Sequence, residues 1–300
     1  MAIKLHSPVV RMLYDKHEHT EEHRNSNHEF VWYDIRPNLL SNRTLSLFVQ
    51  AHQDEETTGF LQTCFDKSDW LFTQLYHSIS RSILTWFMTA TSCNGLLNRG
   101  SMFVYSSELF RKLINVDQDF KAERLLDLAN NCELLAVFSF RVLEIDDWDK
   151  TLPVVPSKTK ITQADVESPK AQYDVVACLN LLDRCAEPLT LLRRMRAVLK
   201  PESGRLVIAL VLPLSQYVET TPNNEPLEFL EVGESRAWEV QFDNFITNVL
   251  VPAGLELVRW TRVPYLCEGD FARSFYSLND VVMVVKAANA TVPSDDASES

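Results

Sequence analysis

An apolar run that ends on polar residues constrains the fold of this chain most strongly. Tyr173 and Asp174 open the run, residues 175–179 (VVACL) are apolar, and Asn180 and Asp183 follow closely. A run of this length between polar groups is typical of a strand that is buried on both faces of a sheet. Ligands of open α/β sheets bind outside the carboxyl ends of such strands. Asn180 and Asp183 are therefore candidate site residues.

Neighbouring segments predict an α/β fold around this strand. Five further runs have the length and apolar character of strands: residues 124–128, 136–145, 205–212, 255–265 and 276–287. A helix is expected at residues 188–199, with Pro188 in its first turn, and an amphipathic helix at 238–252. In this order, strands alternate with helices and two successive strands come last. Such an order indicates an α/β sheet with an antiparallel edge.

Composition divides the chain into four parts. We expect a flexible polar arm at residues 1–30, a helical region at 31–120, the α/β domain at 121–287 and a disordered acidic tail at 288–300. In the helical region, apolar residues recur at helical spacing in three segments: 44–49, 58–64 and 68–88. Ser107 is expected to cap a further helix at 108–114. Residues 149–172 predict a loop.

Charge and cysteine usage exclude several classes of function. The formal net charge is −12, which argues against general binding to nucleic acid or anionic membranes. No apolar run reaches the length of a membrane helix, and the first residues lack a signal-peptide core, which favours a cytoplasmic location. The six cysteines form no metal-ligand pattern. His17-Glu18-His19 lacks a positioned third ligand, so no metal is expected there either.

Four stretches resemble the DREV family of methyltransferases. They are Asn94-Gly95 with residues 99–104, residues 124–128 (RLLDL), residues 178–185 (CLNLLDRC) and residues 264–270 (PYLCEGD). The resemblance covers most of residues 30–287. It implies a class I, Rossmann-like methyltransferase domain with S-adenosyl-L-methionine as cofactor, and an association of the family with endomembranes. It also implies a protein-histidine methyltransferase that acts on the Nδ1 (pros) nitrogen in His-x-His segments of protein substrates.

The resemblance assigns roles to five residues. Asn180, Tyr265 and Asp127 correspond to cofactor-binding positions, and Asp183 and Tyr276 are the candidate catalytic residues. A carboxylate that accepts a hydrogen bond from imidazole Nε2–H would fix the tautomer whose Nδ1 carries the lone pair. The alternative for Asn180 and Asp183 is a helix cap or turn pair. For Tyr276 the alternative is core packing.

One departure from the family pattern leaves a second interpretation open. The family follows its first strand with a glycine-rich cofactor loop, whereas Leu128 leads here into ANNCELL, and no glycine lies between Gly100 and Gly204. Only seven residues separate Leu128 from Ala136, too few for a helical crossover. The sheet is therefore expected to be incomplete. The chain is then either an active methyltransferase or an inactive relative that serves as a peptide-binding module. A third interpretation, an oxidoreductase on the same fold, has no support because this chain lacks the phosphate-binding loop.

Overall fold

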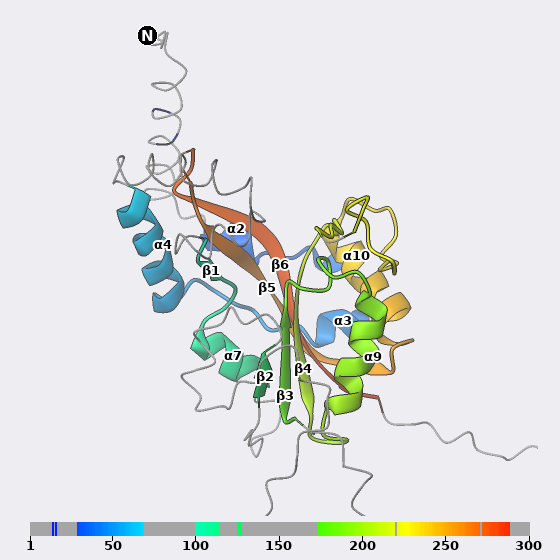
Figure 1. The fold of residues 1–300 in the computed structure, drawn as a ribbon. Helices are drawn as coiled ribbons and strands as arrows, with labels where there is room; N and C mark the ends of the chain where they lie inside the picture. The colour runs from blue at the N-terminus through cyan, green and yellow to red at the C-terminus, as the bar shows by residue number, and fades with distance from the viewer. Residues whose placement is uncertain are drawn as a thin grey trace, which may run out of the picture.

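One mixed sheet, with six strands among the described residues, organises the protein. The structure, a computed structural model, describes Tyr14, Lys16 and residues 29–68, 100–114, 125–127, 173–219, 221–270 and 272–288. The strands are β1 (Met102–Phe103), β2 (Leu125–Asp127), β3 (Val175–Leu179), β4 (Arg205–Val211), β5 (Leu255–Glu268) and β6 (Phe275–Ala287). Their order across the sheet is β1-β5-β6-β4-β3-β2. Figure 1 shows β5 and β6 as a long hairpin along the middle of the molecule.

The strand directions match the sheet that the sequence predicts. β2, β3 and β4 are parallel, with Leu125 in register with Val175 and Val175 with Arg205. β6 runs antiparallel to both β4 and β5. The expected class I methyltransferase sheet, Rossmann-like and with a late antiparallel strand, is thus confirmed. The position of that strand was predicted wrongly: β6 is not at an edge but lies between β4 and β5, where both of its edges are paired.

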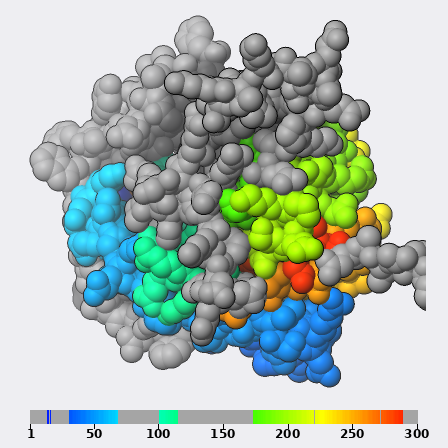
Figure 2. Space-filling model, turned by 90° about the horizontal axis from the view of Figure 1, so that it is seen from below, coloured from blue at the N-terminus to red at the C-terminus, as the bar shows by residue number. Residues whose placement is uncertain are grey.

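Helices cover the two faces of the sheet. α3 (Asn42–Ser46), α9 (Pro188–Val198), α10 (Trp238–Phe245) and the π-helical turn η4 (Ile246–Leu250) pack on one face. α2 (Glu29–Tyr33) and α7 (Ser107–Ile114) cover the other, and α4 (Glu55–Ser68) packs near the β5–β6 turn. Figure 2 shows the same separation, with α4 and α7 (cyan to teal) on one side and α9 (yellow-green) on the other. A 3-10 turn, η1 (Pro37–Leu39), precedes α3.

A cluster of aromatic rings fixes α3 and α10 to β5. Trp260 of β5 is completely buried, and its ring centroid lies 4.6 Å from that of Phe242 and 4.8 Å from that of Phe48. Its indole Nε1 donates a hydrogen bond of 2.7 Å to the carbonyl oxygen of Thr44. The buried N–H is therefore satisfied while the ring contributes its full apolar area.

Several predictions about the helices can be compared with the structure. The helices expected at 58–64, 108–114 and 188–199 are confirmed, with the bounds given above. The helix expected at 44–49 is correct only in its first half, because α3 ends at Ser46 and Phe48 forms a β-bridge with Trp260. The cap of α7 was assigned wrongly: Ser106, not Ser107, accepts the hydrogen bond from the backbone nitrogen of Leu109, at 3.1 Å. The helix expected at 238–252 changes to π geometry after Phe245. Segments 69–88, 136–145 and 149–172 lie outside the described residues.

Candidate functional site

Asn180 lies directly after β3 in a left-handed backbone conformation, with φ of 51°. Its backbone nitrogen still donates to the carbonyl oxygen of Ala209, at 2.9 Å, so the residue follows the last ladder bond to β4. Asparagine is one of the few residues that adopts this conformation readily. The side-chain Nδ2 donates to Oδ2 of Asp280, at 2.9 Å. The amide is therefore held at the carboxyl end of the strand, as predicted.

Asp280 is a site residue that the sequence analysis missed. It lies on β6, in register with Val211 of β4 and Val263 of β5, and is completely buried. Burial raises the pKa of its carboxyl to about 7; the hydrogen bond from Asn180 opposes this shift, and the nearby charge of Asp183 adds to it. The sequence did contain a signal for this residue, because an acid stands directly before the apolar run VVMVV. Aspartate is rarely buried beside such a run unless its carboxyl has a partner.

Asp183 lies in the turn between β3 and α9 and is only 3% exposed. Its Oδ2 pairs with Nε of Arg184 at 3.1 Å. Burial raises the pKa of the Asp183 carboxyl, and the charge of Arg184 opposes the shift. The turn is held by the loop after β4, because the backbone nitrogen of Tyr217 donates to the carbonyl oxygen of Asp183, at 2.9 Å.

Tyr265 of β5 completes the group. Its hydroxyl contacts Sδ of Met102, and its backbone is in register with Leu278. Burial raises the pKa of this phenol, and the neighbouring Cys267, Asp280 and Asp183 raise it further. The hydroxyl therefore lies within electrostatic range of both carboxylates. We refer to Asn180, Asp183, Tyr265 and Asp280 as the strand-end site.

Three buried oxygens of the strand-end site have no hydrogen-bond partner. They are Oδ1 of Asn180, Oδ1 of Asp183 and Oδ1 of Asp280. Buried polar atoms in proteins are almost always satisfied, and an unsatisfied one costs about 1–3 kcal/mol. All three atoms are acceptors, so they fit a ligand that presents N–H donors. The ammonium group at the methionine end of S-adenosyl-L-methionine and the N–H of an imidazole both meet this requirement.

Two of the five predicted site residues lie apart from this group or are only partly described. Tyr276 donates from its hydroxyl to Oδ1 of Asp270, at 3.0 Å, and the guanidinium of Arg273 lies 5.7 Å from its ring centroid. It is four residues from Asp280 along β6, about 13 Å at the usual rise of a strand. Asp127 ends β2, in register with Ala177, and only its backbone is described.

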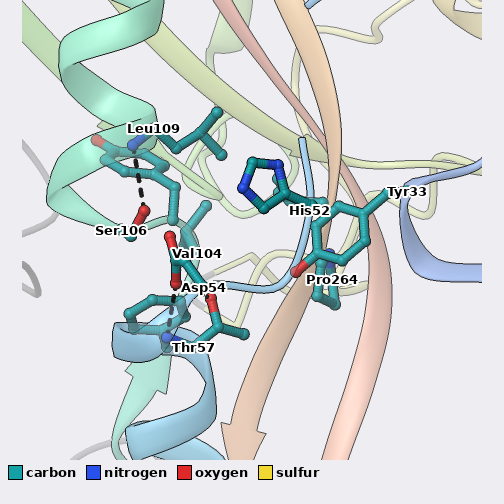
Figure 3. A pocket seen from close by; sticks show the side chains of 11 residues that line it. Tyr33, His52, Asp54, Thr57, Val104, Ser106, Leu109 and Pro264 are labelled. Carbon is teal, nitrogen blue, oxygen red and sulfur yellow. Dashed lines mark hydrogen bonds between the residues drawn. The ribbon is translucent and has the colours of Figure 1, made fainter. Parts of the chain in front are cut away.

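A pocket near α4 and α7 is a poor candidate for a cofactor site. Figure 3 shows His52 and Tyr33 on one side of it, and Asp54 and Ser106 on the other. The cavity measures about 10 Å³, which is enough for about one water molecule. Its polar groups serve as helix caps: Asp54 Oδ1 accepts from the backbone nitrogen of Thr57, at 2.9 Å, and Ser106 caps α7. The strand-end site is therefore the stronger candidate.

The described part of the chain has no helix with the length and apolar character needed to cross a bilayer.

Comparisons with known proteins found distant similarity to solved structures and a match to one family. Among solved structures, the cyclase SpnF is 13% identical, with 61% of this chain and 79% of that chain covered and a TM-score of 0.32. The N-terminal domain of EvdMO1 with SAH bound is 14% identical, with 60% and 79% covered and a TM-score of 0.25. A functionally unknown protein from Deinococcus radiodurans R1 is 9% identical, with 63% and 92% covered and a TM-score of 0.26. The family model of the DREV methyltransferases matches residues 32–287, a span that includes the whole strand-end site, and the chain therefore belongs to the DREV methyltransferase family.

Proposed function

We propose that this protein is an S-adenosyl-L-methionine-dependent protein-histidine methyltransferase that methylates the pros nitrogen in His-x-His segments of protein substrates. In this it would resemble the family member methyltransferase-like protein 9. The observation that carries the proposal is the carboxylate of Asp183, which is 3% exposed, lies just beyond β3 and leaves Oδ1 without a partner. A carboxylate in this position suits a nucleophile that must be held in one tautomer.

The chemistry of imidazole explains the need for such a carboxylate. In neutral imidazole one nitrogen carries the proton and only the other has a lone pair in the ring plane. Oδ1 of Asp183 accepts from Nε2–H of the substrate histidine and leaves Nδ1 free to attack. As positive charge develops on the ring, the same contact stabilises the imidazolium, as the acid of a hydrolase triad does. Arg184 holds Oδ2, at 3.1 Å, and so orients the carboxylate.

The other members of the site fit the cofactor. S-adenosyl-L-methionine supplies an electrophilic methyl group on a sulfonium. Asn180, at the carboxyl end of β3, and Tyr265 on β5 would contact its methionine portion. Asp127 ends the neighbouring strand β2, three residues before the level of Asn180, since Asp127 is in register with Ala177. Tyr276 would line the substrate side.

The variant Asp183→Asn tests the catalytic assignment. An amide cannot stabilise the imidazolium as a carboxylate does, so methyl transfer to a His-x-His peptide should fall by roughly 10²–10⁴-fold. Affinity for S-adenosylhomocysteine, measured by calorimetry, should stay within a few-fold. Glu187→Gln is the matched control, because Glu187 is exposed and makes no side-chain cap bond to α9. Turnover that is unchanged in Asp183→Asn would remove Asp183 from the mechanism.

A peptide-binding module without catalytic activity is the second candidate, and one observation favours it. The chain has no glycine between Gly100 and Gly204, so the loop after β2 lacks the residue that most easily brings backbone amides close to a cofactor. Titration of the folded chain with S-adenosylhomocysteine separates the candidates. Micromolar binding supports the methyltransferase, whereas binding of a His-x-His peptide alone supports the module.

A further inference from the structure

We propose that Asp280 is a positioning residue that makes the site bind the ammonium group, and not the carboxylate, of the methionine portion of the cofactor. Its carboxylate orients the amide of Asn180 so that Oδ1 faces the ligand and accepts a hydrogen bond from an ammonium group. The inference rests on the proposed cofactor, S-adenosyl-L-methionine, and adds the basis of its recognition.

The hydrogen bond between the two side chains fixes the orientation of the amide. An amide of asparagine can present either two N–H donors or an oxygen acceptor, whereas an ionised carboxylate only accepts. When Asp280 is ionised, at a pH above its folded pKa of about 7, Nδ2 of Asn180 faces the carboxylate, and the Nδ2–Oδ2 distance is 2.9 Å. Oδ1 of Asn180 then points away from this bond, and it is buried without a partner.

The fold holds both partners rigidly. Asp280 lies on β6, which is paired on both sides, to Val211 of β4 and to Val263 of β5. Asn180 follows the last ladder bond between β3 and β4. β4 lies between β3 and β6 and is paired to both, so the two partners are held across one strand in the interior of the sheet. Groups held in this way are more precise than groups on loops.

The charges around Asn180 favour an ammonium over a carboxylate. Asp183 and Asp280 are both buried, at 3% and 0% exposed, and each has an oxygen without a partner. Arg184 is a nearby cation, but its side chain is 52% exposed and is already paired with Asp183. A ligand carboxylate would lie against the unsatisfied oxygens of Asn180, Asp183 and Asp280, and unpaired like charges are costly in a buried site. A ligand ammonium would meet several acceptors at once.

A pair of ligands tests the proposal on the unmodified protein. Calorimetry should compare S-adenosylhomocysteine with its deaminated analogue, which lacks only the amino group. The wild-type chain should prefer S-adenosylhomocysteine by at least about tenfold, the effect expected of charged hydrogen bonds to a buried acceptor. Equal affinity for the two ligands would overturn the inference. A folded wild-type chain that binds neither ligand would instead contradict the proposed function itself.

The variant Asp280→Asn tests the role of the carboxylate. Asparagine at this position can donate as well as accept, so the amide of Asn180 is free to turn over. The preference for S-adenosylhomocysteine should shrink to less than threefold, while affinity for the deaminated analogue stays within twofold of wild type. A merely structural role would weaken both ligands equally and would contradict the proposal. Glu256→Gln is the control, because it also removes a carboxylate from the sheet but lies on β5 beside Lys286, away from the site.

Discussion

The backbone at Asn180 and its side chain have separable roles. The left-handed conformation, with φ of 51°, is strained for residues with a Cβ other than asparagine and aspartate and is free of strain for glycine. Asn180→Gly and Asn180→Ala both remove the amide and differ by one methyl group, so this backbone cost is the main difference between them. We expect the glycine variant to be more stable by about 1 kcal/mol. Urea denaturation of the two variants measures the difference, and equal stability would mean that the strand end relaxes when the amide is lost.

Asp280 should make stability depend on pH near neutrality. Its pKa in the folded protein is about 7, above the ordinary value of 3.8, because the carboxyl is buried among Asn180, Asp183, Tyr265 and Cys267. The folded state therefore binds a proton more tightly than the unfolded state. The contribution of Asp280 to stability is largest below about pH 4, falls as the pH rises through the interval up to about 7, and is level above it.

Denaturation of the wild type and of Asp280→Asn at pH 5 and pH 8 measures this contribution. The wild type should lose at least about 1 kcal/mol more than the variant between the two pH values. Asp183 also has a raised pKa and contributes in the same direction in both proteins. The difference between them therefore measures Asp280 together with its charge interaction with Asp183. A parallel loss in the two proteins would show that Asp280 is already ionised at pH 5.

At the scale of elements, aromatic packing holds α10 to the sheet. Phe242 of α10 is completely buried, and its ring centroid is 4.6 Å from that of Trp260. Phe242→Ala should cost about 3–5 kcal/mol, because it removes a buried ring and leaves a cavity beside Trp260. Val251→Ala, at a position that is 54% exposed, should cost less than about 1 kcal/mol. Thermal unfolding followed by circular dichroism would distinguish the two losses.

The elements that the sequence predicted well are those with a local pattern. β3 and β4 follow from continuous apolar runs, and α9 follows from Pro188 and the helical spacing after it. The placement of β6 between β4 and β5 has no local signal, because it depends on register between distant segments. For the same reason Asn180 and Asp183 were found at a strand end, whereas Asp280, one hundred residues from Asn180 in sequence, was not.

At the scale of the whole molecule, the strand-end site draws on three distant parts of the chain. Residues 180–183 come from the β3–α9 turn, Tyr265 from β5 and Asp280 from β6. The site thus exists only when the parallel strands and the late hairpin are joined. The formal net charge of −12 has the same sign as the two buried carboxylates of the site, Asp183 and Asp280. Both features favour a cationic ligand, since the net charge of the protein and the carboxylates of the site both attract positive charge.

The central position of β6 also has a consequence for biosynthesis. Of the six strands, β6 is the last to leave the ribosome, yet it is the one that joins β4 to β5. Until residues 275–287 emerge, β4 has an unpaired edge of apolar residues, and β5 is paired only to the two-residue strand β1. Such edges pair readily with other chains. We therefore expect the nascent protein to depend on chaperones until β6 has emerged, and to become resistant to aggregation abruptly when β6 inserts.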